Sequence, residues 1–295
     1  MPVLYETTDK IGLVTLNRPE KLNALNNEMR EALSAAFRQA DEDATTSVVV
    51  LRGAGRSFCV GYDIGGAGGG NEAWRRDALK FHDRLNASLS IELQPWYMKK
   101  PVIASVQGHA LGAGCEIAMF CDLTIAADDA QFGEPETRHA QAGPGFVMPW
   151  IIGYKKAREL LYFGDTIDAK TALALGMVNR LVPAAALPEA TIKYAARLAL
   201  IAPEALAATK LAINRGADAA GFHNAMQAGI DVVAPLYAAQ TETGLKFKEM
   251  AQKEGLQAAL FLELPAAPLQ RGRFADRAPR RSLEEIVVHQ NASIR

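Results

Sequence analysis

The sequence predicts an α/β fold in which helices cover the faces of a sheet. Two observations support this prediction. Apolar, β-branched runs alternate with segments of helical spacing in the first half of the chain, and helical segments dominate after Ala186. Continuous apolar runs are typical of strands that are covered on both faces. With 295 residues, of which 49% are hydrophobic, the chain is long enough for one large domain or one domain with an appendage.

The first sixty residues read as strand, strand, helix and strand. Ile11–Leu16 is apolar and ends before Pro19, as a strand followed by a turn would. Residues 25–40 carry apolar side chains at helical spacing. Further buried strands are predicted at residues 47–51, 101–106 and 122–127.

The remaining chain contains a loop, more helices and an unusual tail. The glycine-rich residues 65–70 predict a flexible loop, and residues 71–93 a rather polar helix. Pro203 is expected to open a later helix and Gly216 to close it. From about residue 264 the chain is rich in proline and arginine, and we expect this tail to be partly disordered.

Composition excludes several classes of protein. The net charge is −1, so no overall field attracts nucleic acid or an acidic membrane. The N-terminus lacks a basic and then apolar leader, and no apolar run reaches about 20 residues. Three cysteines without C-x-x-C spacing indicate buried, reduced thiols. The alternative is a reactive Cys115 at a helix N-terminus, where the helix dipole would lower the pKa of the thiol. We expect a cytoplasmic protein.

Known nucleotide and metal motifs are missing. The glycine pair at 53 and 55 lacks the third glycine of a dinucleotide fingerprint because Phe58 occupies that position, and the pair at 112 and 114 lacks it because of Ile117. No phosphate-binding loop motif occurs, and the five histidines show no metal-ligand spacing. We therefore expect neither a metal nor a separate cofactor.

The segment Gly112-Ala113-Gly114 has two interpretations of equal weight. Small residues at a helix start leave outward-pointing N–H groups that can bind an oxyanion. Alternatively, they only permit close packing of the helix against a strand.

Two carboxylates follow this turn. Glu116 begins an otherwise apolar helix, so burial is expected to raise its pKa into the range of a general acid or base. A helix of about 15 Å followed by a strand of about 16 Å would return the chain to the same level just before Glu136. Glu134 competes with Glu136, but it would face the other way if the segment is extended. We expect the five histidines to be structural or solvated, and the alternative for His139, which is close to Glu136, is that it lines the pocket.

Five segments, in this order, resemble the enoyl-CoA hydratase/isomerase (crotonase) superfamily over residues 5–260. They are Leu16–Leu25, Ser57–Ile64, Gly108–Asp122, Phe132–Glu136 and Gly164–Asn179. Each segment alone is weak evidence, but five of them in the family's order are highly specific.

The resemblance implies an α/β crotonase fold, a spiral of β-β-α units with a helical C-terminal trimerisation region. It implies a core over residues 1–200 with an acyl-CoA site, a helical region over 201–262 and a tail over 263–295. It also implies a homotrimer or a dimer of trimers. Coenzyme A is then part of the substrate rather than a cofactor.

The resemblance also assigns roles to single residues. The N–H groups of Tyr62 and Ala113 would form an oxyanion hole, Glu116 would activate water, and Glu136 would protonate C2 of the substrate. Ala113 stands where many members of the family have glycine, and residues 146–150 replace a glycine-rich continuation, so we expect an altered acyl pocket. The implied substrate-binding residues are Lys21, Leu22, Ala24, Val60, Asp63, Ile64, Gly65, Gly112, Phe146 and Trp150.

Retention of both glutamates favours an enoyl-CoA hydratase, which adds water reversibly and in the syn sense to a 2-enoyl-CoA. The alternatives are enoyl-CoA isomerisation, hydroxyacyl-CoA dehydration, acyl-CoA hydrolysis, or a non-catalytic acyl-CoA-binding protein that uses its basic tail for contacts.

Overall fold

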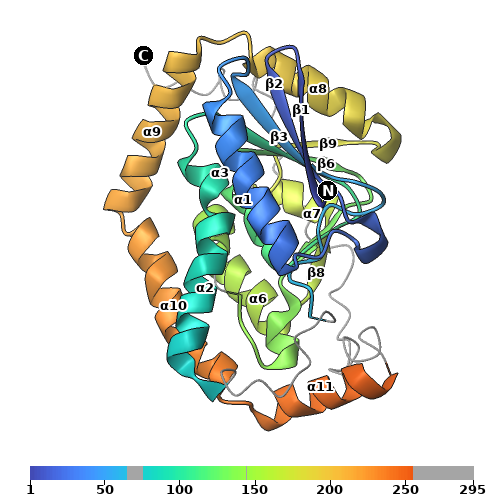
Figure 1. The fold of residues 1–295 in the computed structure, drawn as a ribbon, viewed down its shortest axis with the longest axis vertical. Coiled ribbons are helices and arrows are strands. Elements are labelled where there is room, and N and C mark those ends of the chain that lie inside the picture. The colour runs from blue at the N-terminus through green and yellow to red at the C-terminus, as the bar shows by residue number, and fades with distance from the viewer. Residues whose placement is uncertain (65–75, 144, 255–295) are drawn as a thin grey trace, which may run out of the picture. The chain divides into compact units, whose positions relative to one another are not determined.

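The computed structural model describes residues 1–64, 76–143 and 145–254. Its larger sheet has the strand order β1-β2-β3-β4-β6-β9, in which β1 pairs antiparallel with β2 and all other neighbours are parallel (Figure 1). These strands are β1 (Val3–Thr8), β2 (Ile11–Leu16), β3 (Val48–Gly53), β4 (Val102–Val106), β6 (Leu123–Ala127) and β9 (Arg180–Val182). The three strands predicted after the first helix are confirmed with slightly shifted ends.

A second, smaller sheet gives the chain its spiral course. It has the order β5-β7-β8, formed by His109–Leu111, Gln131–Gly133 and Thr166–Asp168. The chain passes from β4 of the larger sheet to β5 of the smaller one and then into a helix, and β6 and β7 repeat this step. The predicted α/β spiral of β-β-α units is therefore confirmed.

Helices surround these sheets. In the described residues the α-helices up to β9 are α1 (Asn27–Glu42), α2 (Ala78–Glu92), α3 (Gln94–Tyr97), α4 (Ala113–Phe120), α5 (Met148–Ile152), α6 (Tyr154–Phe163) and α7 (Ala169–Ala174). Short 3₁₀ helices are η1 (Pro19–Lys21), η3 (Pro135–His139) and η4 (Ala184–Ala186). Asn26 caps α1, because its side chain accepts a hydrogen bond from the N–H of Met29.

The hydrophobic core lies on both faces of the larger sheet. Along β2, Val14 and Leu16 pack into the larger cluster with α1, α2 and α4, whereas Ile11 and Leu13 face the smaller cluster beneath α8. This alternation follows the two-residue period of a strand. Every residue of β2 is buried, which explains its continuous apolar run.

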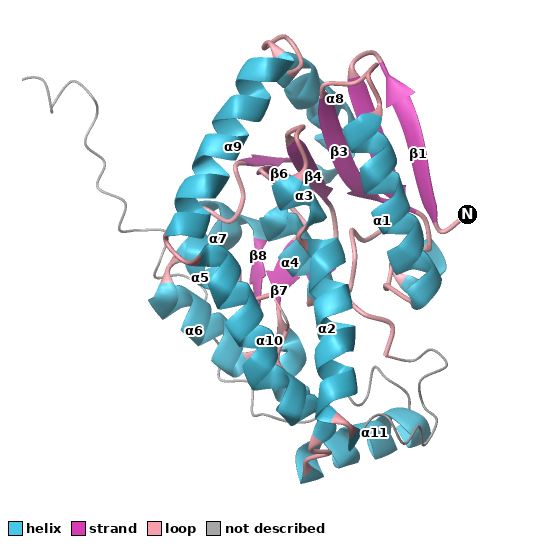
Figure 2. Ribbon diagram, turned by 60° about the vertical axis from the view of Figure 1, so that its left-hand side comes forward, coloured by secondary structure: helices cyan, strands magenta, loops and turns pink. Residues whose placement is uncertain are grey.

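The C-terminal part is helical, as predicted. It comprises α8 (Leu187–Leu198), α9 (Pro203–Ala219), α10 (Phe222–Ala238) and α11 (Glu242–Glu254). Figure 2 shows α10 lying beside α2. Pro203 opens α9 as expected, but the predicted end at Gly216 is wrong. Gly216 lies inside the helix, and the left-handed glycine that ends it is Gly221, with φ +101°.

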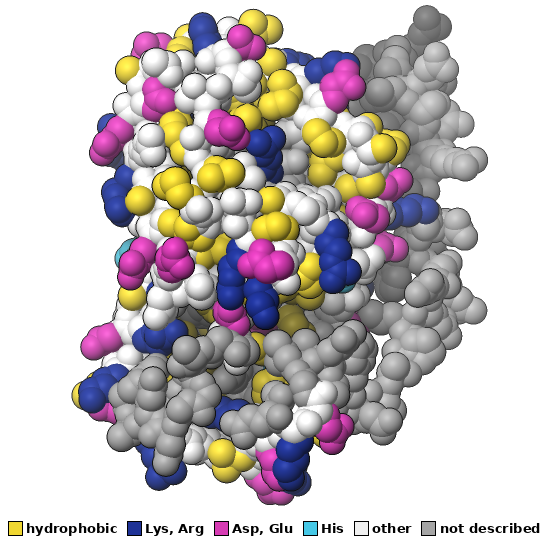
Figure 3. All heavy atoms as spheres, turned by 45° about the vertical axis from the view of Figure 1, so that its right-hand side comes forward, with side chains coloured by type: hydrophobic (Ala, Val, Ile, Leu, Met, Phe, Trp, Pro, Cys, Tyr) yellow, Lys and Arg dark blue, Asp and Glu magenta, His cyan; other side chains and the backbone are white. Residues whose placement is uncertain are grey.

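Some predictions concern residues outside the described ranges. These are the loop at 65–70, the first five residues of the helix predicted at 71–93, and the tail at 263–295. On the face drawn in Figure 3, acidic and basic side chains are interspersed, in keeping with the net charge of −1. No helix among the described residues is both long and apolar enough to span a membrane.

Candidate active site

Two chain segments meet at the start of α4. The N–H of Cys59 donates to the carbonyl of His109 (3.0 Å), and the N–H of Leu111 donates to the carbonyl of Cys59 (2.9 Å). This pairing brings Gly61 against the next turn. A Cβ atom on Gly61 would lie 2.9 Å from the Leu111 oxygen and 3.3 Å from the Ala113 nitrogen. Only glycine allows so close an approach at φ +87°, and the approach places the residue before Tyr62 against the N–H of Ala113.

The N–H groups of Tyr62 and Ala113 are not used by the backbone around them. Ala113 is the first residue of α4, so its N–H has no partner within the helix. The N–H of Leu25 donates to the Gly61 carbonyl, and the N–H of Asp63 donates to the Leu25 carbonyl. These two hydrogen bonds involve the residues before and after Tyr62 and leave the Tyr62 N–H unused. Within the described ranges, neither the Tyr62 nor the Ala113 N–H donates to another backbone carbonyl. The two groups are therefore available to an oxyanion.

Glu116 lies in the first turn of α4, and its side chain is completely buried. Its Oε1 atom accepts a hydrogen bond from the Gly145 N–H (2.8 Å), whereas Oε2 has no partner among the described residues. The loop that follows η3 folds tightly over this carboxyl group. A Cβ atom on Gly143 would lie 2.5 Å from Glu116 Oε1, so no larger residue fits there without displacing the carboxyl group.

Glu136 approaches the same turn from the 3₁₀ helix η3. Its Oε1 atom lies against Gly112, where an added Cβ would be only 2.3 Å away. Its Oε2 atom has no hydrogen-bond partner in the part of the chain that the structure describes. The Glu136 carboxyl group therefore lies at the start of α4, the helix whose first turn carries Glu116.

Glu134 also points into this region, contrary to expectation. The argument that it would face away assumed an extended segment, but Pro135 starts η3 immediately after it and turns the chain. Glu134 is buried, and a Cβ atom on Gly143 would lie 3.0 Å from its Oε2 as well as close to Glu116. The site therefore contains a carboxyl group that sequence reasoning placed elsewhere.

Burial is the main cause of the raised pKa values of the two glutamates in this site. Burial, followed by repulsion from Glu92 and Glu134, raises the pKa of Glu116 well above its ordinary value. Burial likewise raises the pKa of Glu136 to about 7. No ion pair of the described residues includes either group. A carboxyl group with a pKa of about 7, such as that of Glu136, can both hold and accept a proton at physiological pH.

His139 and Cys115 are both buried close to these glutamates in the chain. Desolvation lowers the pKa of His139 to about 4, and its ring stacks on Phe247 of α11 with centroids 4.2 Å apart. Burial raises the pKa of Cys115 well above the ordinary value, so the alternative of a reactive thiolate at this helix start is wrong.

The other predicted substrate-binding residues differ in how far they are exposed to solvent. Lys21 is exposed at the end of η1, and Leu22 follows it next to Val60, whose N–H donates to the Leu22 carbonyl (3.3 Å). Ala24 is buried and Ile64 is exposed. The Asp63 carboxylate pairs with Arg18 (2.6 Å), and Gly65 lies outside the described residues.

Phe146 and Trp150 follow Gly145, the residue whose N–H donates to Glu116. Phe146 packs on α10 so closely that a Cβ atom on Gly229 would be 2.3 Å from its ring. Trp150 meets the ring of Phe222 edge-on, with centroids 5.4 Å apart. The Tyr237 hydroxyl of α10 donates to the Ala142 carbonyl (2.9 Å) and so holds the loop that covers Glu116.

Sequence reasoning missed Glu92 as well as Glu134. Glu92 is the last residue of α2, and its carboxyl group is buried. One signal was present: the spacing of Phe81, Leu85, Leu89 and Glu92 puts all four on the same face of a helix. A glutamate in line with a buried apolar stripe indicates a specific environment.

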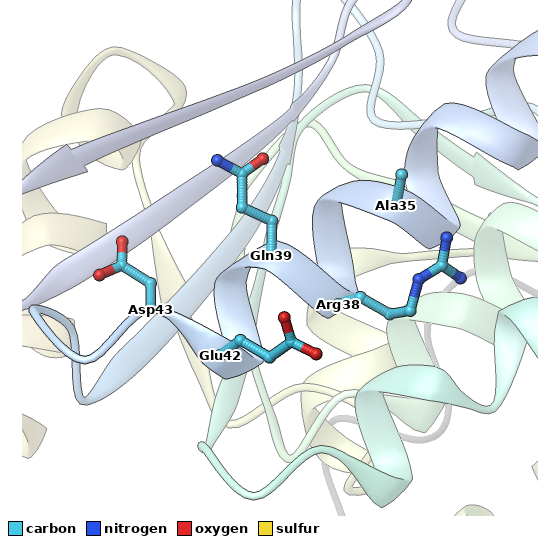
Figure 4. A pocket seen from close by; sticks show the side chains of 5 residues that line it. All are labelled: Ala35, Arg38, Gln39, Glu42 and Asp43. Carbon is cyan, nitrogen blue, oxygen red and sulfur yellow. The ribbon is translucent and has the colours of Figure 1, made fainter.

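A surface hollow lies elsewhere on the described part of the molecule, and it does not contain the predicted site residues. Figure 4 shows a hollow beside the end of α1, lined by Ala35, Arg38, Gln39, Glu42 and Asp43, which contains none of the predicted site residues. Over residues 1–64, 76–143 and 145–254, no group of three or more His, Cys, Asp or Glu side chains is arranged to hold a metal ion.

Comparison with known proteins agrees with this geometry. A family model described as enoyl-CoA hydratase/isomerase matches residues 6–256. The chain is 34% identical to a crotonyl-CoA hydratase of Syntrophomonas wolfei, over 88% of this chain and 94% of that protein. It is 35% identical to a short-chain-enoyl-CoA hydratase of Clostridium acetobutylicum, over 72% of this chain and 81% of that protein.

Solved structures agree as well. A crystal structure of an enoyl-CoA hydratase/isomerase from Xanthobacter autotrophicus matches with a TM-score of 0.81 and 34% identity, covering 88% of this chain and 96% of that one. The fold, the two glutamates and these relatives together show that the chain belongs to the enoyl-CoA hydratase/isomerase family and has the crotonase fold.

Proposed function

We propose that this protein is an enoyl-CoA hydratase, a hydro-lyase that adds water reversibly across the 2,3 double bond of a 2-enoyl-CoA. The observation that carries the proposal is that the Glu136 carboxyl group lies against Gly112, at the start of the helix whose first turn carries the buried Glu116. The names of the relatives from Syntrophomonas wolfei and Clostridium acetobutylicum support it.

The proposed reaction begins with polarisation of the thioester. Its carbonyl oxygen accepts hydrogen bonds from the N–H groups of Tyr62 and Ala113, which makes C3 electrophilic. Each such donor is typically worth about 3 kcal/mol in the transition state. The N–H donors gain strength because the site is buried and contains no competing cation.

The two glutamates then move one proton each. The Glu116 carboxylate takes a proton from water while the water oxygen bonds to C3, and the negative charge passes to the thioester oxygen as an enolate. Protonated Glu136 gives its proton to C2 and the enolate collapses to the 3-hydroxyacyl-CoA. One proton is taken up and one released, so the enzyme needs only proton exchange with solvent to reset.

We assign the remaining contacts by the same proposal. Lys21 and Leu22 lie near the nucleotide part of coenzyme A, and Phe146 and Trp150 border the acyl group. We further propose a cytoplasmic homotrimer or dimer of trimers. Its support is the set of large apolar side chains exposed on α9 and α10, namely Leu211, Ile213, Val232 and Leu236.

The test is turnover of a panel of 2-enoyl-CoAs with short, branched and aromatic acyl groups. We expect loss of the conjugated enoyl-thioester absorbance together with formation of the 3-hydroxyacyl-CoA. The double variant E116Q/E136Q, shown to be folded, serves as the control for contaminating activity. A folded wild type that hydrates no member of the panel would overturn the proposal. A shifted double bond or free coenzyme A as the sole product would indicate an isomerase or a hydrolase instead.

A further inference from the structure

The side chain of Tyr62 forms a hydrogen bond with α2, although its backbone N–H belongs to the proposed oxyanion hole. The Tyr62 hydroxyl donates to Oε1 of Glu92, the last residue of that helix. Only 1% of Glu92 is exposed, so little water competes for this bond. Its other oxygen, Oε2, has no donor among the described residues. Loss of the tyrosine hydroxyl would therefore leave a buried acceptor without its donor.

The ring of Tyr62 is also held by α1. The Arg30 guanidinium of this helix lies 5.7 Å from the ring centroid, which is within the range of a cation–π interaction. The ring packs against the larger hydrophobic cluster as well. A cation of α1 at its face and a carboxyl group of α2 at its hydroxyl thus fix the tyrosine side chain to two helices.

The peptide bond between Gly61 and Tyr62 carries the N–H of the proposed oxyanion hole. Its carbonyl, on Gly61, accepts a hydrogen bond from the Leu25 N–H (2.8 Å). Because the peptide bond is trans, the Tyr62 N–H points the opposite way, away from Leu25. Gly61 has no side chain, so the side chain of Tyr62 is the one that anchors this peptide plane directly.

The two N–H groups of the proposed hole are thus oriented in different ways. The N–H of Ala113 is the first of α4, so the helix itself sets its direction. The N–H of Tyr62 lies outside any helix or strand, next to a glycine at φ +87°, where the backbone has more freedom. Hydrogen bonds weaken steeply when the donor is misaligned, so the anchor of Tyr62 determines how well its N–H binds an oxyanion.

We propose that Glu92 is a positioning residue for the oxyanion hole: by accepting the hydrogen bond of the Tyr62 hydroxyl, it fixes the peptide plane whose N–H binds the thioester oxygen. This inference rests on the proposed function, in which that N–H polarises an acyl-CoA. Glu92 acts through Tyr62 and transfers no proton to the substrate.

The first test compares kcat and KM of wild type with those of Y62F, E92M, E92Q and the double variant Y62F/E92M. The first two remove one partner of the bond but keep the backbone N–H. Each should lower kcat by about tenfold, less than the roughly 10²–10³-fold loss of a whole oxyanion donor. KM should change by less than about threefold, because the weakened contact acts mainly in the transition state.

The other two variants ask whether the bond itself is responsible. The double variant should lose no more kcat than either single variant, because both substitutions remove the same bond. E92Q retains a side-chain oxygen that can accept from the tyrosine hydroxyl, so its kcat should stay within about threefold of wild type. Losses that multiply in the double variant, or E92Q as impaired as E92M, would overturn the inference.

The matched control is Y5F, which removes a hydrogen bond of the same kind outside the site. The Tyr5 hydroxyl of β1 donates to the Asp43 carboxylate (2.7 Å), just after α1. We expect Y5F to keep the kcat of wild type. Urea unfolding determines the folded fraction of each variant. Reduced stability with wild-type kcat in the folded Y62F and E92M would show a purely structural role and overturn the inference.

A second measurement separates this inference from the proposed hydration. Butyryl-CoA has no double bond to hydrate, and the infrared band of its ¹³C-labelled thioester carbonyl reports hydrogen bonding to the carbonyl oxygen. Binding to wild type, E92Q and Y5F should shift the band to lower frequency, and binding to Y62F and E92M should shift it less. This pattern supports the inference even if no enoyl-CoA is hydrated. Equal shifts in all variants, or no shift in wild type, overturn it even in an active hydratase.

Discussion

The two ends of α4 hold buried charge in opposite ways. At its start, Glu116 accepts one backbone hydrogen bond, and the charged groups that act on it are other carboxyl groups. Just beyond its end, the Asp122 carboxylate accepts hydrogen bonds from Lys210 (2.7 Å) and from the Val102 N–H (2.7 Å). Lys210, which is buried, also donates to the carbonyls of Pro95 (2.6 Å) and Lys100 (3.0 Å).

The comparison distinguishes a charged pair that stabilises the fold from charged groups that serve catalysis. The pair of Asp122 and Lys210 neutralises its own charge and joins α9 to the starts of β4 and β6, so its removal should affect folding. The glutamates gather like charge where water is excluded, which costs folding free energy. Such an arrangement makes sense where protons must be moved at neutral pH.

The largest expected effect tests the start of α4. Glu116→Gln and Glu136→Gln should each lower kcat/KM by about 10²–10⁴-fold, because each removes a proton-transfer group. Both variants should unfold at higher temperature than wild type at pH 8, because a buried like charge is removed. Activity and stability are measured on the same preparations, and a simultaneous loss of both would contradict the comparison.

The second prediction concerns the ion pair of Asp122 and Lys210, just beyond the end of α4. Lys210→Met should lower the free energy of unfolding by about 3 kcal/mol, because it leaves Asp122 and two backbone carbonyls without their donor. The kcat of the folded fraction should remain that of wild type. Urea unfolding measures the change, and Lys193→Met, at an exposed pair with Glu189, is the matched control that should change stability by less than about 0.5 kcal/mol.

A third variant tests the turn that joins the glutamates. Gly112→Ala places a Cβ atom 2.3 Å from Glu136 Oε1 at φ +53°, so Glu136 must move. A displacement of this size should lower kcat by about 100-fold. Gly176→Ala is the control, because Gly176 also has a positive φ (+82°) but has nothing within 4 Å of the added atom. Equal kcat losses in the two variants would assign the effect to backbone strain alone.

The smallest effect concerns pH and Glu134. Burial raises the pKa of Glu134 well above its ordinary value, so the folded state keeps a proton that the unfolded state has already lost. Stability is therefore complete below the unfolded pKa and falls as the pH rises through the folded pKa. Glu134→Gln should add at least about 1 kcal/mol of unfolding free energy at pH 8 and much less at pH 4. Urea unfolding at the two pH values measures this, and an equal gain at both would refute the assignment.

The parts of the fold that follow from local pattern were predictable. The continuous apolar runs of β2 and β3 predicted strands covered on both faces, and both are buried on two sides. The lengths of one helix and one strand permitted Glu136 to return to the level of Glu116 but could not prove that the two carboxyl groups meet. The roles of these residues came from the family resemblance and remain predictions.

What could not be predicted depends on tertiary contacts. Glu134 was placed on the wrong side because the sequence does not show that Pro135 begins a 3₁₀ turn rather than continuing a strand. Glu92 lies far from Tyr62 in sequence, and only the folded structure brings its carboxyl group to the Tyr62 hydroxyl. Likewise, nothing in the sequence indicates that Gly229 of α10 receives the ring of Phe146.

The hydrogen bond from Tyr237 to Ala142 bears on how the chain can be divided. Glu116 is fixed by Gly145, the loop that carries Gly145 is held by Tyr237, and Tyr237 belongs to α10. The helical segment after residue 200 is thus not an appendage that could be exchanged between relatives while the chemistry stays behind. Recombination of this enzyme with another of its family should keep α10 and the loop over Glu116 from the same parent.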